Sequence, residues 1–392
     1  MSADIPSMQS DLRAAKLDGW LFYDFRGRDP IAQRILELPE GMRTRRWFYF
    51  VPAKGRPKKL VHKIETQSLA ALPGETLYYA GQDELRRNVG KILGRAKNVA
   101  MQYSPKNAIP YVAMVDAGTI ELVRGSGVKV VSSADLVQKY EACWSDEQLE
   151  SHRSAGAAID RIVREAFQHA AKNVREKRTI TEYELKVWIL SEFEAAGIWT
   201  EEGPDIAVNS NASDPHYGPT AESAAPIREG DLLLLDVWGK KKTPGSVYYD
   251  VTWIGYLGAK VPEKYAKVFG VVREARDKVV DLILNNIAAG KPLQGWQVDK
   301  AARSVIEKAG YGKYFFHRTG HSIGEKVHGN GANMDGLETH DVRHLIPRTC
   351  SSIEPGIYLP DFGIRSEVNV YIDEREAQVT GAVQKEILPL LA

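Results

Sequence analysis

The sequence predicts a small α/β domain followed by a larger α+β domain. With 392 residues, the chain is longer than one hydrophobic core usually serves. Up to about residue 133, short runs of aromatic and β-branched residues alternate with helix-like segments, which is typical of an α/β unit. After that point helices mix with antiparallel hairpins, which favours α+β over a doubly wound sheet. We place the boundary at Trp144, so that the domains are 1–144 and 145–392.

Apolar runs give the expected strands of the first domain, and an amphipathic pattern gives its expected helix. The strands are GWLFYDF (19–25), RWFYFVP (46–52), KKLVHKI (58–64) and KVVSS (129–133), and the helix is DELRRNVGKILGRA (83–96).

The second domain opens with two helices that carry start signals. Ser145, followed by Asp146 and Glu147, supplies an N-cap and two acids that the helix dipole favours, so a helix is predicted from there to about Asn173. Thr181-Glu182-Tyr183-Glu184 fits the capping box of a second helix. The remaining expected elements are strands 231–240 and 246–258, helices 262–286 and 297–309, and strands 350–359 and 363–372.

The composition is that of an ordinary soluble globular protein, with 43% hydrophobic and 26% charged residues. The formal net charge of +1 provides no overall field for nucleic acid or a membrane surface, so small, near-neutral partners are expected. No uncharged run approaches the ~18 residues of a membrane span, and the N-terminus resembles no signal peptide. Cys143 and Cys350 form no CxxC pair, which argues against a disulfide framework. These features indicate a cytoplasmic protein.

Two predicted hairpins bring acidic residues together. Folding the first hairpin back about residue 243, near Pro244-Gly245, sets Asp236 opposite Asp250, with Thr252 on the same face. Opposed residues on one face have β-carbons ~5 Å apart, so two carboxylates can share a cation. Folding the second hairpin back between residues 360 and 361 sets Glu354 opposite Glu367, with Arg365 on the face of Glu367.

These four acids need a positive partner if they are buried, because an unpaired buried carboxylate costs several kcal/mol to desolvate. The alternative is that they lie on solvated faces of edge strands. Apolar neighbours such as Leu235 and Val368 argue against that alternative. With an imidazole added, the oxygen and nitrogen ligands suit Mn²⁺, Co²⁺, Zn²⁺ or Fe²⁺.

The stretch HRTGHSIGEKVHGN (317–330) permits a serine or a metal interpretation. Gly320 to Gly324 fits the Gly-x-Ser-x-Gly pattern around Ser322, but a nucleophile elbow needs a histidine on a later strand, and the last histidine, His344, follows too soon. Residues 340–344, HDVRH, imitate HExxH without its glutamate, and Pro347 follows closely. Both patterns are therefore interpreted as loop residues.

Six segments, in this order, resemble the pita-bread metallopeptidases, which comprise Xaa-Pro dipeptidases (prolidases), Xaa-Pro aminopeptidases and methionyl aminopeptidases, with creatinase as a metal-free relative. They are DPHYGP, GDLLLLDVWG, YYDVTW, HRTGHSIGEKVH, SIEPGIY and GIRSEVNVY. The resemblance covers about residues 145–385 and implies the α+β pita-bread (creatinase/aminopeptidase) fold there. The first 140 residues resemble the family's creatinase-type α/β domain in length and coarse pattern.

The resemblance also implies a set of site residues. The implied ligands of a two-metal centre, holding Mn²⁺ or alternatively Co²⁺ or Zn²⁺, are Asp236, Asp250, His321, Glu354 and Glu367. The implied catalytic residues are His216, His328 and, as a proton shuttle, Glu354. The implied substrate-binding residues are His317, on the proline side, and Arg365, which could instead neutralise Glu367.

The implied activity is hydrolysis of the bond before proline by an Xaa-Pro dipeptidase, acting on a small peptide with proline in second position. An Xaa-Pro aminopeptidase, a metal-free creatinase-type hydrolase and a non-catalytic binding module are the alternatives. The first domain is expected to shape substrate access and homodimer contacts. Departures from the family pattern are the fourteen-residue separation of Asp236 and Asp250, Trp253 in place of an arginine, and Gly329 in place of an acid.

Overall fold

The computed structural model describes residues 4–39, 41 and 43–392. The chain divides into two compact units, Met1–Glu141 and Ala142–Ala392. The boundary predicted from the sequence, after Trp144, lies three residues beyond this division. No helix of the described chain combines the length and apolar character that a membrane span requires.

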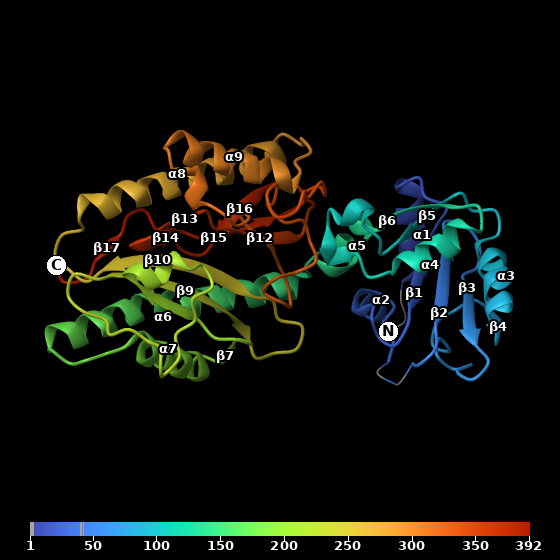
Figure 1. Ribbon diagram of the computed structural model, residues 1–392, viewed down its shortest axis with the longest axis horizontal. Helices are drawn as coiled ribbons and strands as arrows, with labels where there is room; N and C mark the ends of the chain where they lie inside the picture. The colour runs from blue at the N-terminus through green and yellow to red at the C-terminus, as the bar shows by residue number, and fades with distance from the viewer. Residues whose placement is uncertain (1–3, 40, 42) are drawn as a thin grey trace. The chain divides into compact units, whose positions relative to one another are not determined.

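The first unit is built on one six-stranded sheet with the order β4-β3-β2-β1-β5-β6 (Figure 1). Strand β2 is antiparallel to both neighbours, and the other pairs are parallel. The elements are α1 (Ile5–Ala14), β1 (Gly19–Asp24), α2 (Pro30–Ile35), β2 (Trp47–Pro52), β3 (Lys58–His62), β4 (Glu75–Tyr79), α3 (Gln82–Leu93), β5 (Asn98–Met101), α4 (Ala117–Arg124), β6 (Lys129–Ser132) and α5 (Ala134–Glu141).

Both faces of this sheet are buried, as an α/β unit requires. Alternation along β1 sends Trp20 and Phe22 into one hydrophobic cluster, and Leu21 and Tyr23 into another on the opposite face. The strands and the helix predicted for this unit are all present.

The second unit contains three sheets and four long helices. Its sheets are β17-β10-β9-β7 with β8 paired to β9, β11-β12-β15-β16, and β13-β14. The elements are α6 (Asp146–Arg175), α7 (Glu182–Ala195), β7 (Ile198–Trp199), β8 (Asp205–Val208), β9 (Leu232–Lys241), β10 (Tyr249–Tyr256), α8 (Glu263–Ala288), α9 (Gly295–Lys308), β11 (Ser322–Ile323), β12 (Thr349–Ile353), β13 (Gly356–Leu359), β14 (Phe362–Arg365), β15 (Val368–Ile372), β16 (Ala377–Thr380) and β17 (Leu388–Pro389).

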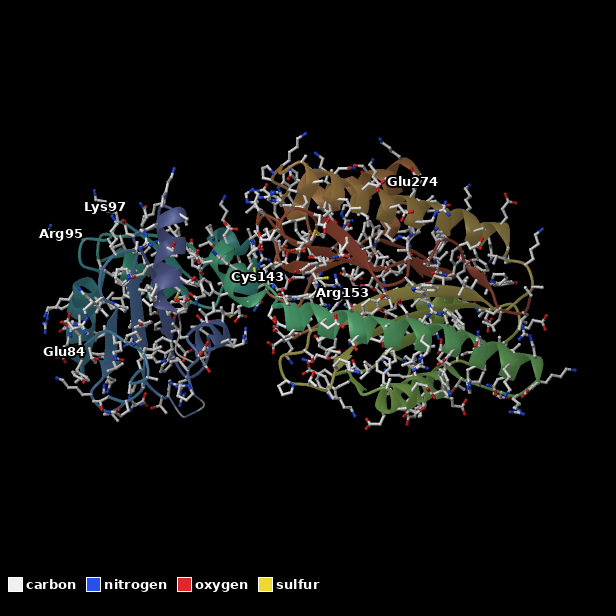
Figure 2. All side chains as sticks on the ribbon, turned by 180° about the vertical axis from the view of Figure 1, so that it is seen from behind. Glu84, Arg95, Lys97, Cys143, Arg153 and Glu274 are labelled. Carbon is white, nitrogen blue, oxygen red and sulfur yellow. The ribbon has the colours of Figure 1, made fainter. Side chains whose placement is uncertain are left out.

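The helix start signals are confirmed. Ser145 caps α6 in a capping box with Gln148, and Thr181 caps α7 in one with Glu184. Helices α6 and α8 are amphipathic, and their exposed faces carry charged side chains such as Arg153 and Glu274 (Figure 2).

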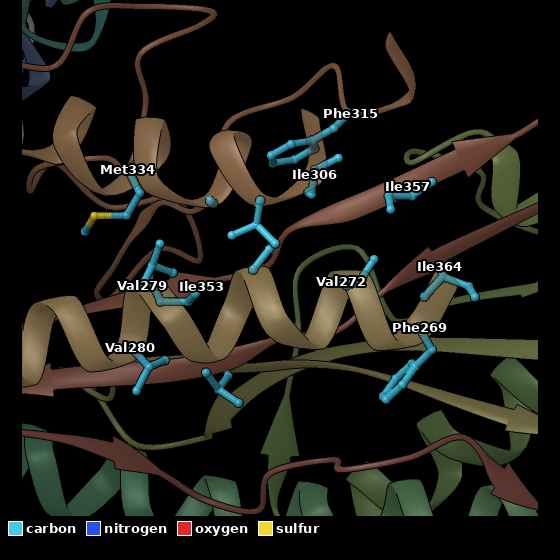
Figure 3. Close-up of a cluster of buried hydrophobic side chains, with 14 of the residues drawn as sticks. Phe269, Val272, Val279, Val280, Ile306, Phe315, Met334, Ile353, Ile357 and Ile364 are labelled. Atoms are coloured by element: carbon cyan, nitrogen blue, oxygen red, sulfur yellow. The ribbon is translucent and has the colours of Figure 1, made fainter. Parts of the chain in front are cut away.

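The helices cover the sheets of the second unit from two sides (Figure 1). On one side, α6 and α7 pack against β9 and β10 in a cluster that contains Phe167, Leu235 and Val251. On the other side, α8 and α9 form a cluster with the C-terminal strands, where Val272 and Ile353 are among the buried side chains (Figure 3). The strands that carry the predicted acids therefore lie between two apolar layers.

The predicted register of the first acidic hairpin is wrong by two residues. Asp236 lies opposite Thr252, and Asp250 lies opposite Trp238. The connection between β9 and β10 places the centre of the fold-back at residue 244, one residue later than the turn signal suggested. An offset of two keeps Asp236 and Asp250 on one face, as diagonal neighbours.

The register of the second acidic hairpin is confirmed, but each predicted strand is broken in two. Gly356 pairs with Arg365, and Ile353 pairs with Val368, so Glu354 and Glu367 face each other between two short ladders. Pro355 has no N–H for a continuous ladder. The backbone N–H of Glu354 instead donates to Thr319, and that of Glu367 donates to Thr252.

Replacement of Gly320 by alanine tests the packing that positions His321. A β-carbon at Gly320 would lie 2.0 Å from the carbonyl oxygen of Ser352, so the segment would have to move away from β12. We expect Gly320→Ala to lower the free energy of unfolding by about 1–3 kcal/mol, as measured by denaturant unfolding. The control Gly324→Ala, whose β-carbon would have no neighbour closer than 4.0 Å, should stay within about 1 kcal/mol of the parent. Equal losses in both variants would contradict the packing argument.

Candidate metal centre

Three predicted ligands form a compact cluster. Asp250, His321 and Glu367 each place one ligand atom within 4.8 Å of the other two, and all three residues are buried. They come from strand β10, from the residue before β11 and from the break between β14 and β15. Three segments that are well separated in the sequence thus meet at one point, and Asp250 and Glu367 are 117 residues apart (367 minus 250).

Glu354 completes a four-residue arrangement around the imidazole of His321. The Nε2 atom of His321 lies 3.4 Å from Glu354 Oε1 and 3.5 Å from Asp250 Oδ2. Its Nδ1 atom lies 3.2 Å from the carbonyl oxygen of Ser322, so Nδ1 carries the proton and Nε2 presents a lone pair to the carboxylates. The Ser352 hydroxyl donates to Glu354 Oε1 at 3.1 Å and accepts from the His321 N–H at 2.9 Å.

Asp236 joins the group through Thr252 and Arg365. The Thr252 hydroxyl lies 3.0 Å from Asp236 Oδ1 and 2.9 Å from Glu367 Oε2, and it has one proton to donate between them. Arg365 donates from Nε to that hydroxyl at 3.0 Å and forms an ion pair with Asp236 through Nη2. The expected alternative partner of Arg365 was Glu367, whereas the ion pair is with Asp236.

The electrostatics of the cluster favour a bound cation. Burial, reinforced by Asp236, raises the pKa of Asp250 well above its usual range, and burial, reinforced by Asp250, does the same to the pKa of Glu367. Burial also raises the pKa of Glu354 and lowers the pKa of His321. Arg365 supplies one positive charge to this group of buried acids, and the neutral His321 supplies none, so the negative charge is only partly balanced.

Two unpartnered atoms show that the residues fit a divalent cation. Asp250 Oδ1 and Glu367 Oε1 are buried and have no hydrogen-bond partner among the described residues. A buried carboxylate oxygen left without a donor is costly, whereas a hard or borderline cation would satisfy it. The donor set of carboxylates and one imidazole is the one that such cations take.

The two predicted catalytic histidines lie on the exposed side of this cluster. The ring of His328 is 4.4 Å from that of His321, edge to face, and His328 is exposed. The neighbouring His321, together with partial burial, lowers the pKa of His328 to about 3. His216 is also exposed, and it contributes to the same lowering of the His328 pKa.

The predicted substrate-binding pair is joined by a residue that the sequence interpretation did not assign. The Tyr358 hydroxyl lies 2.7 Å from His317 Nε2 and accepts from Arg365 Nη1 at 3.0 Å. Because His317 Nδ1 lies 2.7 Å from the carbonyl oxygen of Arg318, Nδ1 carries the proton and Nε2 accepts from Tyr358. Burial, with Arg365 nearby, lowers the pKa of His317 to about 3, so this histidine is neutral.

Sequence reasoning also missed Ser352 and Asp205. Strand alternation could have found Tyr358 and Ser352, which lie four residues after and two residues before Glu354. Asp205 pairs across the strands with Asp236, and burial and that neighbour raise its pKa to about 6. Only the pairing of β8 with β9 reveals it.

The serine and HDVRH patterns have structural roles. Ser322 is buried, and its hydroxyl accepts from the N–H of Gly331 at 3.0 Å. Residues 340–344 are not helical, and Asp341 forms a buried ion pair with Arg343 at 2.6 Å. Neither pattern has the geometry of the catalytic motif that it imitates.

Comparison with known proteins agrees with this geometry. Residues 150–374 match the model of metallopeptidase family M24. The chain is 27% identical over 330 residues to a "Probable dipeptidase PepE" of Mycobacterium bovis, covering 83% of this chain and 80% of that one. It is 29% identical over 239 residues to an "Xaa-Pro dipeptidase" of Lactobacillus helveticus, covering 60% and 58%. The solved structure of dipeptidase PepE from Mycobacterium ulcerans superposes with a TM-score of 0.68 at 23% identity, covering 98% and 96%.

The chain therefore belongs to metallopeptidase family M24, and its second unit has the α+β pita-bread fold. The predicted family, fold and enzyme class are confirmed. Membership of this family implies the use of divalent metal, and the cluster of Asp250, His321 and Glu367 has the ligand atoms to hold an ion.

Metal removal should destabilise the protein more as the pH rises. In the metal-free protein the buried acids have folded-state pKa values above their unfolded values of about 4, so stability falls as the pH rises through the raised values. A cation that replaces the protons stabilises the protein over the same window. We expect the Mn²⁺-induced rise in thermal midpoint of EDTA-treated protein to be larger at about pH 8.5 than at about pH 7. At both pH values His321 is mainly neutral in the folded and the unfolded protein, so its titration does not cause the difference.

The variant Asp250→Asn isolates the cluster. Without metal at about pH 8.5 it should unfold at a higher temperature than the metal-free parent, because one unpaired buried charge is gone. It should also lose most of the Mn²⁺-induced shift. The exposed Asp281→Asn is the matched control and should behave like the parent. An undiminished Mn²⁺ shift in Asp250→Asn would contradict a metal site at this cluster.

Proposed function

We propose that this protein is an Xaa-Pro dipeptidase, a proline-specific exopeptidase that acts through a dinuclear metal centre. The observation that carries the proposal is the buried cluster of Asp250, His321 and Glu367 with two unpartnered carboxylate oxygens. Membership of family M24 and the names of the dipeptidase relatives support it. The metal-free creatinase-type reaction and a non-catalytic module are disfavoured because every predicted ligand is present.

The proposed ligands are the five residues predicted from the sequence, and Mn²⁺ is the proposed ion, with Co²⁺ or Zn²⁺ as alternatives. When bound, a pair of such cations lowers the pKa of water and polarises the scissile carbonyl. Arg365 and Thr252 hold Asp236 in place, and the Ser322 carbonyl holds the His321 tautomer. Ser352 restrains the carboxylate of Glu354.

Glu354 is the proposed proton carrier. Its side chain is 16% exposed, so it can reach both a bound water and the leaving group. His328 and His216 are the proposed partners of the developing oxyanion and the leaving nitrogen. With a pKa of about 3, His328 acts as a neutral N–H donor and not as a cation.

The proline side is assigned to His317 and Arg365. Proline leaves a tertiary nitrogen at the scissile bond, so the pocket needs shape and not an acceptor for an N–H. His317 and Tyr358 supply a rigid hydrogen-bonded wall, and Phe316, which is 52% exposed, lies against Tyr358 with ring centroids 5.3 Å apart. Arg365 is 4% exposed and is held by Asp236, Thr252 and Tyr358, which favours neutralisation of the acid cluster as its main role.

An Xaa-Pro aminopeptidase acting on longer peptides is the second candidate, because the same centre serves either reaction. Homodimer formation, a cytoplasmic location and control of substrate access by residues 1–144 belong to the proposal. Of these, the control of substrate access would distinguish the two activities, because a first domain that restricts the length of the entering peptide would favour the dipeptidase.

The comparison of three substrates decides between these activities. We expect kcat/KM for Ala-Pro to exceed that for Ala-Pro-Ala and for Ala-Pro-amide, because a dipeptidase reads the free carboxylate on proline, and a charge-assisted hydrogen bond contributes about tenfold or more. Initial rates measured by release of free alanine provide the test. Cleavage of the tripeptide as efficiently as the dipeptide would identify an Xaa-Pro aminopeptidase.

Two alanine variants separate the metal mechanism from the serine one. His328→Ala should lower kcat about 10²-fold with bound metal unchanged by elemental analysis, because a donor to the transition state is lost. Ser322→Ala should keep most of the activity, and a serine-directed phosphonate should not inactivate the parent. A covalent phosphonate adduct on Ser322 would reverse the assignment.

A further inference from the structure

The net charge of the chain is +1, but the charged residues are unevenly distributed between the two units. Residues 1–141 contain 22 Lys and Arg but 15 Asp and Glu, a formal charge of +7, whereas residues 142–392 contain 30 basic and 36 acidic residues, a formal charge of −6. The expectation that the chain has no electrostatic preference for anions therefore does not hold for the first unit taken alone.

Part of this positive charge surrounds a hollow of about 770 Å³ in the first unit. Its lining includes the cations Arg28, Arg45, Arg46 and Arg86, together with His62. That volume is within the range of pockets that hold small organic ligands, roughly 300–1,000 Å³.

The sheet topology explains why these side chains meet. Strands β1, β3 and β4 run in the same direction, and β2 runs against them, so the ends of the first three and the start of β2 share one edge of the sheet. Arg28 follows β1, Arg45 and Arg46 precede β2, and His62 ends β3 opposite Tyr79. In α/β sheets the carboxyl edge of parallel strands is where ligands bind.

These guanidinium groups form few direct ion pairs. Among the described residues, no carboxylate forms an ion pair with the side chain of Arg28, Arg45 or Arg46, although Glu65 accepts from the backbone N–H of Arg45 at 3.2 Å and its carboxylate is stabilised by the charge of Arg45. Arg46 donates to the neutral amide of Gln82 at 2.8 Å, and Arg86 lies 3.8 Å from an exposed Asp83. An exposed pair at that distance contributes little.

Of the two acids that line the hollow, Asp116 and Glu121, the first is already engaged. Asp116 caps helix α4, and its two oxygens accept from the N–H and the hydroxyl of Thr119 at 2.9 and 2.8 Å. Its charge is therefore directed to the helix and not to the arginines.

A second basic hollow in the same unit, of about 860 Å³, has an internal explanation. Its cations include Arg13 and Lys58, as well as Arg95, which is labelled in Figure 2. They lie around the C-terminal ends of α1 and α3, where the helix dipoles favour positive charge. Lys58 donates to the carbonyl of Lys91 in the last turn of α3 at 3.2 Å. Among the described residues, no arginine of the first hollow donates to a helix carbonyl in this way.

We propose that the hollow lined by Arg28, Arg45, Arg46, Arg86 and His62 binds a small phosphorylated anion of nucleotide size. The planar guanidinium fork matches phosphate oxygens in pairs, and several arginines around one hollow favour a ligand with several negative charges. The half-buried ring of Phe25, with Arg28 5.4 Å from its centroid, adds an aromatic surface beside the phosphate subsite. This inference is independent of the peptidase reaction.

Isothermal titration calorimetry of the full-length protein tests the proposal. ATP and inorganic pyrophosphate should bind to one site and adenosine should not, with affinity falling as ionic strength rises. The double variant Arg45→Ala/Arg86→Ala should weaken ATP binding by about a hundredfold, roughly tenfold per charge-assisted pair. The matched control, Lys54→Ala/Arg95→Ala, removes the same charge from the second hollow and should bind ATP like the parent. Unchanged thermal midpoints establish that both variants are folded.

Five outcomes would overturn the proposal. Equal loss of ATP binding in both double variants would show a general field and not a site. Binding of adenosine as strongly as ATP would show that phosphate is not recognised. The absence of binding heat with both ATP and pyrophosphate would show that the hollow does not bind phosphorylated anions. Finally, loss of a homodimer in Arg45→Ala/Arg86→Ala alone, or single-stranded DNA binding more tightly than ATP, would assign the arginines to a macromolecule.

Discussion

Repulsion among buried carboxylates is the constraint on which the second unit depends. Asp250 and Glu367 are almost fully buried, and each has an oxygen without a partner among the described residues. Arg365 supplies one positive charge, but its ion pair is with Asp236, and Thr252 has only one proton for two carboxylates. The negative charge that is left has to be balanced by protons or by cations. A cation bound at this cluster would consequently stabilise the folded unit, which couples the proposed metal binding to folding.

The apolar layers on both sides offset the repulsion between the acids because their packing fixes the backbone. The positions of the ligand residues therefore do not depend on attraction between their side chains. Two backbone hydrogen bonds illustrate the point. The N–H of Glu354 donates to Thr319, two residues before His321, and the N–H of Glu367 donates to Thr252, two residues after Asp250. Each strand break thereby ties one ligand-bearing segment to another. A continuous ladder would have used those N–H groups within the hairpin and left the segments independent.

Local signals made much of the fold predictable from the sequence. The caps at Ser145 and Thr181 and the register of the second hairpin follow from residue spacing alone, since each depends on neighbours within one element or one turn. The predicted pairing of Asp236 with Asp250 was wrong because Pro244-Gly245 indicates that a turn is present but does not determine which residue lies at its centre. Asp205 was missed because its place beside Asp236 depends on the pairing of β8 with β9. Strand pairing between distant segments is set by tertiary packing, which periodicity does not reveal.

The Tyr358 hydroxyl joins the charge balance of the centre to the proposed proline side. It accepts from Arg365 and donates to His317, whose other nitrogen donates to the Arg318 carbonyl. These hydrogen bonds fix the neutral form of His317, whose pKa is about 3. The histidine therefore contributes to the shape of the proposed proline pocket and carries no charge. Arg365 gives three of its five N–H groups to protein partners. A free substrate carboxylate would therefore compete for the remaining donors of an arginine that the acid cluster already requires. The proposed dipeptide specificity would therefore have to depend on a restriction of peptide length as well as on recognition of the substrate carboxylate.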